Sequence, residues 1–63
     1  MLKEYYIVKA YEDGELLEEV KATEITKNNN NEVVVLDIYG EYNIYEPFTE
    51  LEIYKVTTER INL

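Results

Sequence analysis

A β-patterned run at residues 33–45 sets the frame of the expected fold. It reads VVVLDIYGEYNIY, and its even-numbered positions are Val34, Leu36, Ile38, Gly40, Tyr42 and Ile44. Successive side chains of a strand point to opposite faces, so these six residues share one face, and five of them are apolar. We therefore expect the even-numbered face to form the floor of the core. Gly40 allows a bend or a tight turn. A bent continuation through residues 41–45 keeps this face in phase, and a separate fourth strand is the alternative.

The first hairpin is indicated by two neighbouring signals. Residues 2–11 are rich in tyrosine, isoleucine and valine, and predict the first strand. Both faces of this strand are apolar, which is typical of a central strand or of one that meets another chain. Asp13 and Gly14 follow, and both residue types tolerate positive φ, so the pair predicts a tight hairpin turn.

Residues 15–27 fit two structures. As a helix, they place Leu16, Leu17 and Val20 on one face, and Asp13 caps the start. As a strand, they point Val20 and Ala22 inward, and a β-bulge returns Ile25 to the core. The Asp-Gly turn that precedes the segment favours the strand.

Two further breaks separate the remaining strands. The four asparagines at 28–31 predict a turn in which side chains bond their own backbone and left-handed conformations are tolerated. Pro47, Phe48 and Leu51 predict a short 3₁₀ turn near residues 47–51, with Phe48 and Leu51 tucked under the sheet. Residues 52–61 predict the last strand.

Together these elements predict one small all-β domain over residues 1–63. We expect a curved antiparallel sheet, or a partly open barrel, of four or five strands. This order of elements is similar to that of small SH3-like barrels, in layout only. The alternative is an α+β fold in which residues 15–27 form a helix on a sheet of three or four strands.

The chain lacks several of the residue types on which disulfides, metal sites and catalysis usually depend. A domain of 63 residues has a marginal core and often needs a disulfide, a metal or a partner chain. There is no cysteine and no histidine, so we expect no disulfide, no metal site and no cofactor. We favour a homo-oligomer, a dimer, as the source of extra stability. Without serine, cysteine or histidine the usual nucleophiles and bases are missing, so we do not expect an enzyme. A pair of carboxylates is the catalytic alternative.

The charge balance points to a protein partner. Fourteen acidic residues face six basic ones, for a formal net charge of −8. This balance argues against direct binding to nucleic acid and to anionic membranes, and favours a basic protein surface. Residues two apart on a strand lie about 6.6 Å apart, close to two steps of a nucleic-acid backbone, so the acidic rows could act as a nucleic-acid mimic. The predicted acidic contacts are Glu12, Asp13, Glu15, Glu18, Glu19, Glu41, Glu46, Glu50 and Glu52.

A second predicted contact surface is apolar and rich in tyrosine, a residue enriched at interfaces. Its members fall on the faces opposite the expected core, and residues 33–35 on an unprotected edge would invite pairing between chains. The other interpretation is a second core face closed by the rest of a barrel. The predicted apolar contacts are Tyr5, Tyr11, Val33, Val35, Tyr39 and Tyr45.

These features predict a non-catalytic, acidic protein-binding module. It would inhibit a larger nucleic-acid-binding, nuclease or defence protein, as phage or mobile-element proteins of this physical type do. The alternative is a structural protein that assembles with itself through the tyrosine-rich face. We expect no signal peptide and no membrane helix, and therefore a cytoplasmic protein, in the host cell if a phage encodes it.

Overall fold

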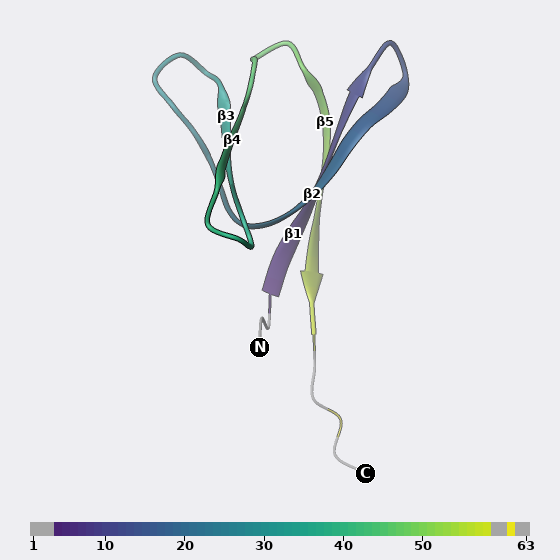
Figure 1. The fold of residues 1–63 in the computed structure, drawn as a ribbon, viewed down its shortest axis with the longest axis vertical. Helices are drawn as coiled ribbons and strands as arrows, with labels where there is room; N and C mark the ends of the chain where they lie inside the picture. The colour runs from purple at the N-terminus through teal and green to yellow at the C-terminus, as the bar shows by residue number, and fades with distance from the viewer. Residues whose placement is uncertain (1–3, 59–60, 62–63) are drawn as a thin grey trace.

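Five antiparallel β-strands form one open sheet in the computed structural model, which describes residues 4–58 and residue 61 (Figure 1). The strands are β1 (Glu4–Glu12), β2 (Glu15–Lys27), β3 (Val33–Asp37), β4 (Tyr42–Tyr45) and β5 (Glu50–Thr57). Their order across the sheet is β4-β3-β2-β1-β5, so β4 and β5 are its edges. The predicted all-β class is confirmed, and the α+β alternative is wrong because residues 15–27 form β2. Within the described residues there is no helix long and apolar enough to cross a membrane.

The hairpin between β1 and β2 turns at the predicted pair. Asp13 has φ 51° and Gly14 has φ 81°, so both central residues lie in the left-handed region. Glu12 pairs with Glu15, which leaves a two-residue turn whose twist matches that of the flanking strands. The predicted first strand of residues 2–11 is observed from Glu4 onward, and residues 2 and 3 lie outside the described residues.

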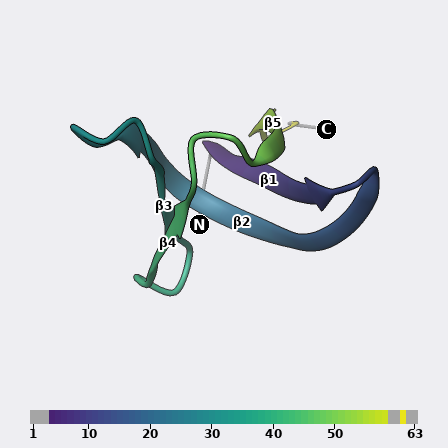
Figure 2. The same cartoon turned by 90° about the horizontal axis from the view of Figure 1, so that it is seen from above.

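Two bulges curve β2. Its pairing with β1 shifts between Glu18 and Leu16, and its pairing with β3 shifts at Thr23, whose hydroxyl lies 3.4 Å from the Leu36 carbonyl oxygen. Beyond the second shift Ile25 pairs with Val35 and packs against the core, so the predicted bulge is confirmed. Figure 2 shows the result: β1 and β5 lie along one part of the curved β2, and β3 and β4 stand across its other end.

The core occupies the inside of this curve, and it uses the odd-numbered face of β3 and β4. Val35 is fully buried and Tyr45 is 9% exposed, whereas Tyr42 and Ile44 are 68% and 60% exposed. Their inward neighbours from β1 and β2 are Val8, Ala10 and Ala22. The prediction that the even-numbered face forms the floor of the core is therefore wrong. Both faces of the run are apolar, and its pairing with β2 decides which one turns inward.

The bend at Gly40 is a hairpin turn between two strands, so the predicted bent continuation is also wrong. Val33 pairs with Tyr45, and the pairing keeps odd residues opposite odd ones. One carboxylate oxygen of Asp37 accepts hydrogen bonds from the backbone N–H groups of Tyr39 and Glu41, both at 2.9 Å. Gly40 itself has φ 87°, a left-handed conformation that glycine adopts without strain.

Of the other two turns, the asparagine turn agrees with its prediction and the turn at residues 46–49 does not. In the asparagine turn, the Asn28 side-chain oxygen accepts from the N–H groups of Asn30 and Glu32, as predicted. The turn at residues 46–49 has one hydrogen bond, from the Thr49 N–H to the Glu46 carbonyl at 3.0 Å, and is a β-turn rather than a 3₁₀ turn.

The predicted position of Phe48 is wrong, because its side chain is 86% exposed and does not lie under the sheet. Its position at the tip of a β-turn directs it outward, whereas Leu51 enters β5 and packs against the core. The last strand, predicted over residues 52–61, is observed as β5 over Glu50–Thr57. Thr58 and Ile61 lie outside the strand, and residues 59 and 60 lie outside the described residues.

Candidate partner-binding site

An open groove lies between the β1–β2 turn and the β4–β5 turn. Pairing of β1 with β5 places Tyr11 opposite Glu50 and brings these two distant turns side by side. The two turns are neighbours at one end of the molecule in Figure 1. The groove has a volume of about 400 Å³. We call it the acidic groove, and its lining consists of Tyr11, Glu12, Asp13, Leu17, Phe48, Thr49 and Glu50.

Carboxylates dominate the charge of the acidic groove. Three of its lining residues are acidic, and Glu15 lies directly opposite Glu12 across the turn. Residues 10–20 and 38–54, which contain both turns, include no lysine or arginine. The ion pairs seen among the described residues join Lys9 to Glu19 at 3.8 Å and Lys55 to Glu4 at 3.7 Å. Neither ion pair neutralises a carboxylate that lines the groove.

Two other predicted acidic contacts are held by tyrosines. The Tyr11 hydroxyl donates to Glu52, which lowers the pKa of that carboxyl and raises the pKa of Tyr11 to about 12. The Tyr45 hydroxyl donates to Glu18 at 2.5 Å, and burial together with this bond raises the pKa of Tyr45. Both bonds fix the position of a carboxylate on the sheet, so Glu52 and Glu18 have part of their hydrogen-bonding capacity in use.

The remaining predicted acidic contacts do not form one surface. Glu46 begins the β4–β5 turn beside the groove, while Glu41 lies at the opposite end of β4, in the β3–β4 turn. Glu19 lies on β2 in its ion pair with Lys9. The sequence grouping of Glu41 with Glu46 and Glu50 is therefore corrected, because the hairpin reverses the chain between them.

Two exposed apolar side chains lie among the groove carboxylates. Leu17 is 60% exposed and Phe48 is 86% exposed. The sequence pattern predicted neither of them as part of this surface, since it placed Leu17 on the face of the possible helix and Phe48 under the sheet. The irregular pairing of β1 with β2, which skips Leu17, and the β-turn around Phe48 both depend on backbone geometry that the pattern alone does not specify.

The predicted tyrosine-rich surface is divided between the two sides of the sheet. Val35 and Tyr45 are buried in the core and Val33 packs against it, so these three belong to the inside of the curve. Because β3 pairs with both β2 and β4, residues 33–35 do not form an edge, which corrects that expectation. Tyr39 is 85% exposed in a turn at the far end of the sheet from the groove.

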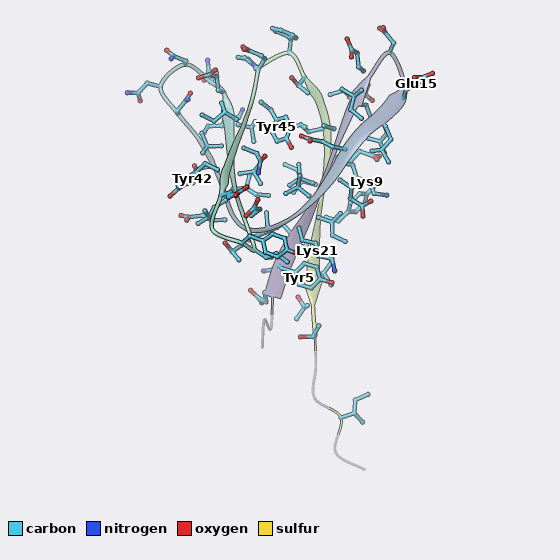
Figure 3. All side chains as sticks on the ribbon, viewed as in Figure 1. Tyr5, Lys9, Glu15, Lys21, Tyr42 and Tyr45 are labelled. Carbon is cyan, nitrogen blue, oxygen red and sulfur yellow. The ribbon has the colours of Figure 1, made fainter. Side chains whose placement is uncertain are left out.

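The two predicted tyrosines of β1, Tyr5 and Tyr11, lie on the outer face. Lys21 places its ammonium 5.7 Å from the centre of the Tyr5 ring, within cation–π range. Figure 3 shows these two side chains together, with Tyr45 inside the curve of the sheet and Tyr42 at its outer side. The six residues of the predicted apolar set therefore do not build a common contact surface.

The acidic groove combines charged and apolar side chains. It offers carboxylate acceptors and two apolar side chains, and in the described ranges no group of three acidic residues is arranged to hold a metal ion. No protein-family model matches the sequence, and it matches no curated protein and no solved structure.

Proposed function

We propose that the protein binds, and thereby inhibits, a larger protein through the acidic groove, and that the target presents a basic, nucleic-acid-binding surface. One observation carries the proposal: pairing of β1 with β5 gathers Glu12, Asp13 and Glu50 around exposed Leu17 and Phe48. Apolar anchors surrounded by charge of one sign form the usual pattern of a protein interface with a charged rim.

Charge supports a basic target. A net charge of −8 steers a positive surface toward the groove and raises the association rate. Glu50 and Glu52 stand two residues apart on β5, a spacing of about 6.6 Å that is close to two phosphate steps. A nucleic-acid groove of the target could accept this row in place of a backbone. Inhibition of a nuclease or a defence protein, of the phage or mobile-element type, follows from that mimicry.

Two related points stay predictions. The strand number and the curvature of the sheet agree with a partly open, SH3-like barrel, which would present the groove at its open end. The absence of serine, cysteine and histidine from the sequence supports a non-catalytic role.

The experiment compares two double charge reversals with the same net charge. Partners are captured from the native lysate at low salt, and each purified candidate is then titrated with the protein and with its variants. Glu12→Lys with Glu50→Lys changes the groove, whereas Glu24→Lys with Glu41→Lys changes exposed acids outside it. We expect the groove variant to weaken binding about tenfold or more relative to the control variant, mainly through slower association and loss of paired carboxylates.

Phe48→Ala tests the apolar component independently of charge. Truncation of an exposed aromatic anchor should weaken binding about tenfold, with little change in salt dependence. In addition, wild-type affinity should fall as salt rises, because the attraction between exposed charges is screened. Equal losses from the two double variants, or an affinity that salt leaves unchanged, would show that the groove is not the site.

A further inference from the structure

The two edges of the sheet differ in charge. The exposed edge strand β5 carries Glu50, Glu52 and Lys55, the kind of residues that block pairing with another chain. The other edge, β4, consists of Tyr42, Asn43, Ile44 and Tyr45 and has no charged residue. Among the described residues its only neighbour in the sheet is β3. This edge therefore lacks the usual protection against strand pairing.

The outer face beside this edge is apolar. Tyr42 is 68% exposed and Ile44 is 60% exposed, and they lie opposite half-buried Leu36 and Val34 on β3. A shallow depression of about 110 Å³ runs between Tyr42, β3 and the polar side chains of β2. A strand added to β4 would extend this apolar face without covering the core.

The hydrogen-bond phase of the hairpin shows which β4 groups face outward. The Asp37 N–H donates to the Glu41 carbonyl at 2.8 Å, so this pair is hydrogen-bonded. Hydrogen-bonded and non-bonded pairs alternate along an antiparallel ladder. Asn43 and Tyr45 therefore turn their backbone groups toward β3, and Tyr42 and Ile44 turn theirs away from it.

We propose that a second copy of this chain pairs with β4 antiparallel, about a two-fold axis at Asn43. In this register Tyr42 of each copy lies opposite Ile44 of the other, and their outward N–H and C=O groups form four hydrogen bonds. The outer faces then join, so that Val34, Leu36, Tyr42 and Ile44 of both copies form one apolar surface. Tyr42, Asn43 and Ile44 of each copy pair with the same three residues of the other, as a two-fold interface requires.

Charge identifies the occupant as a second copy rather than a basic partner. No carboxylate lies within β4 to attract a cation, so this edge favours a neutral strand, and β4 is itself such a strand. In the proposed register Glu41 of one copy lies beside Tyr45 of the other. Glu46 of that copy follows Tyr45 and therefore lies next to Glu41, so one pair of carboxylates meets at each end of the paired strands, and salt screens the repulsion within each pair.

The test measures the oligomeric state of the full chain by sedimentation from about 5 to about 500 µM. Wild type should form a dimer toward the upper end, and added salt should strengthen it, because salt screens repulsion between two chains of charge −8. This response has the opposite sign to that expected for the basic partner. Binding at the acidic groove and pairing at β4 can therefore fail independently.

Two substitutions at Ile44 challenge different parts of the interface. Ile44→Lys adds a charge to the edge, and Ile44→Pro removes an outward N–H while leaving the bonds to β3 intact. Each should weaken the dimer about tenfold or more. Leu16→Lys, at a residue that is 51% exposed on β2, should leave it unchanged. Circular dichroism confirms that each variant keeps its strands, and the Pro variant serves if the Lys variant does not fold.

Hydrogen exchange locates the interface. The amides of Tyr42 and Ile44 should become protected as the concentration rises, while those of the β5 edge should not. A wild type that stays monomeric to about 500 µM, or Ile44 variants that dimerise as well as wild type, would overturn the proposal. Binding of an unrelated apolar peptide at β4 by a monomeric wild type would overturn it as well.

Discussion

Val34 and Val35 are neighbours on β3 that point to opposite sides of the sheet, so truncation of each to alanine tests which face is the core. Val35 is fully buried on the inner side, and Val34 is half-buried on the outer side, beside the shallow depression at β4. The change in β propensity is the same at both positions and cancels in the comparison. We expect Val35→Ala to be several times more destabilising than Val34→Ala.

The magnitude follows from the burial of each side chain. Loss of two methyl groups from a fully buried site costs about 1.6 kcal/mol of transfer free energy. The vacated space, roughly 50 Å³, adds about 1 kcal/mol where the surroundings do not collapse. Val35→Ala should therefore cost about 2 to 3 kcal/mol. Val34→Ala opens onto solvent and leaves no closed cavity, so its cost should stay below about 1 kcal/mol.

Urea unfolding, monitored by circular dichroism, measures both free energies. A chain of this size has about 3 to 9 kcal/mol of stability in total, so the Val35 variant loses a large part of it. With a slope near 1 kcal/mol per M, the midpoint should fall by about 2 to 3 M for Val35→Ala and by less than about 1 M for Val34→Ala. If the Val35 variant is unfolded in water, Val35→Thr and Val34→Thr provide a milder pair. Equal shifts, or a larger shift for Val34, would refute the assignment of the inner face.

Three further perturbations test the turns and the tyrosine–carboxylate bonds. Because the bond to Tyr11 lowers the Glu52 pKa, it stabilises the fold above the usual carboxyl pKa, and this stabilisation is lost as pH falls through the lowered Glu52 pKa. The same bond raises the Tyr11 pKa from 10.0 to about 12, so its stabilisation is also lost as pH rises through that interval. Tyr11→Phe should reduce the loss of stability at both ends of urea midpoints measured against pH, with a residual acid effect because Tyr54 and Lys9 also lower the Glu52 pKa, and unchanged profiles would contradict the bond. Gly14→Ala should cost about 1 kcal/mol through its φ of 81° alone, because an added Cβ meets no atom within 4 Å; a neutral effect in urea unfolding would contradict the left-handed turn. Asn28→Ala should cost about 1 to 2 kcal/mol by removing the acceptor of two backbone N–H groups, with Asn29→Ala as a near-neutral control.

Local chemistry was enough to predict two of the turns and the type of the long strand. The Asp13–Gly14 turn, the asparagine turn and the bulge before Ile25 depend on a few adjacent residues, and all three are observed. Their conformations follow from residue types that accept positive φ or bond their own backbone. These are the parts of the fold that a single sequence specifies directly.

The pairing between distant strands determines which face of residues 33–45 is buried, and the hydrophobic pattern alone does not. Residues 33–45 have two apolar faces, one with Val34 and Ile44 and one with Val35 and Tyr45, and alternation alone cannot rank them. The pairing of Ile25 with Val35 selects the second face as the inner one. The two acidic segments were visible in the sequence, but their meeting at one groove depends on the pairing of β1 with β5.

That pairing also orders the folding of the chain. β1 to β4 join through short turns, whereas β5 adds to β1 only after residues 13–49 have been bridged. Closing this long loop costs entropy before any contact forms, so we expect the β1–β4 meander to assemble first and β5 to dock last. Until β5 docks, β1 is an open edge strand with apolar residues on both faces, and it can pair with a strand of another chain. The growing polypeptide is therefore most exposed to misassembly in the interval between completing β4 and recruiting β5.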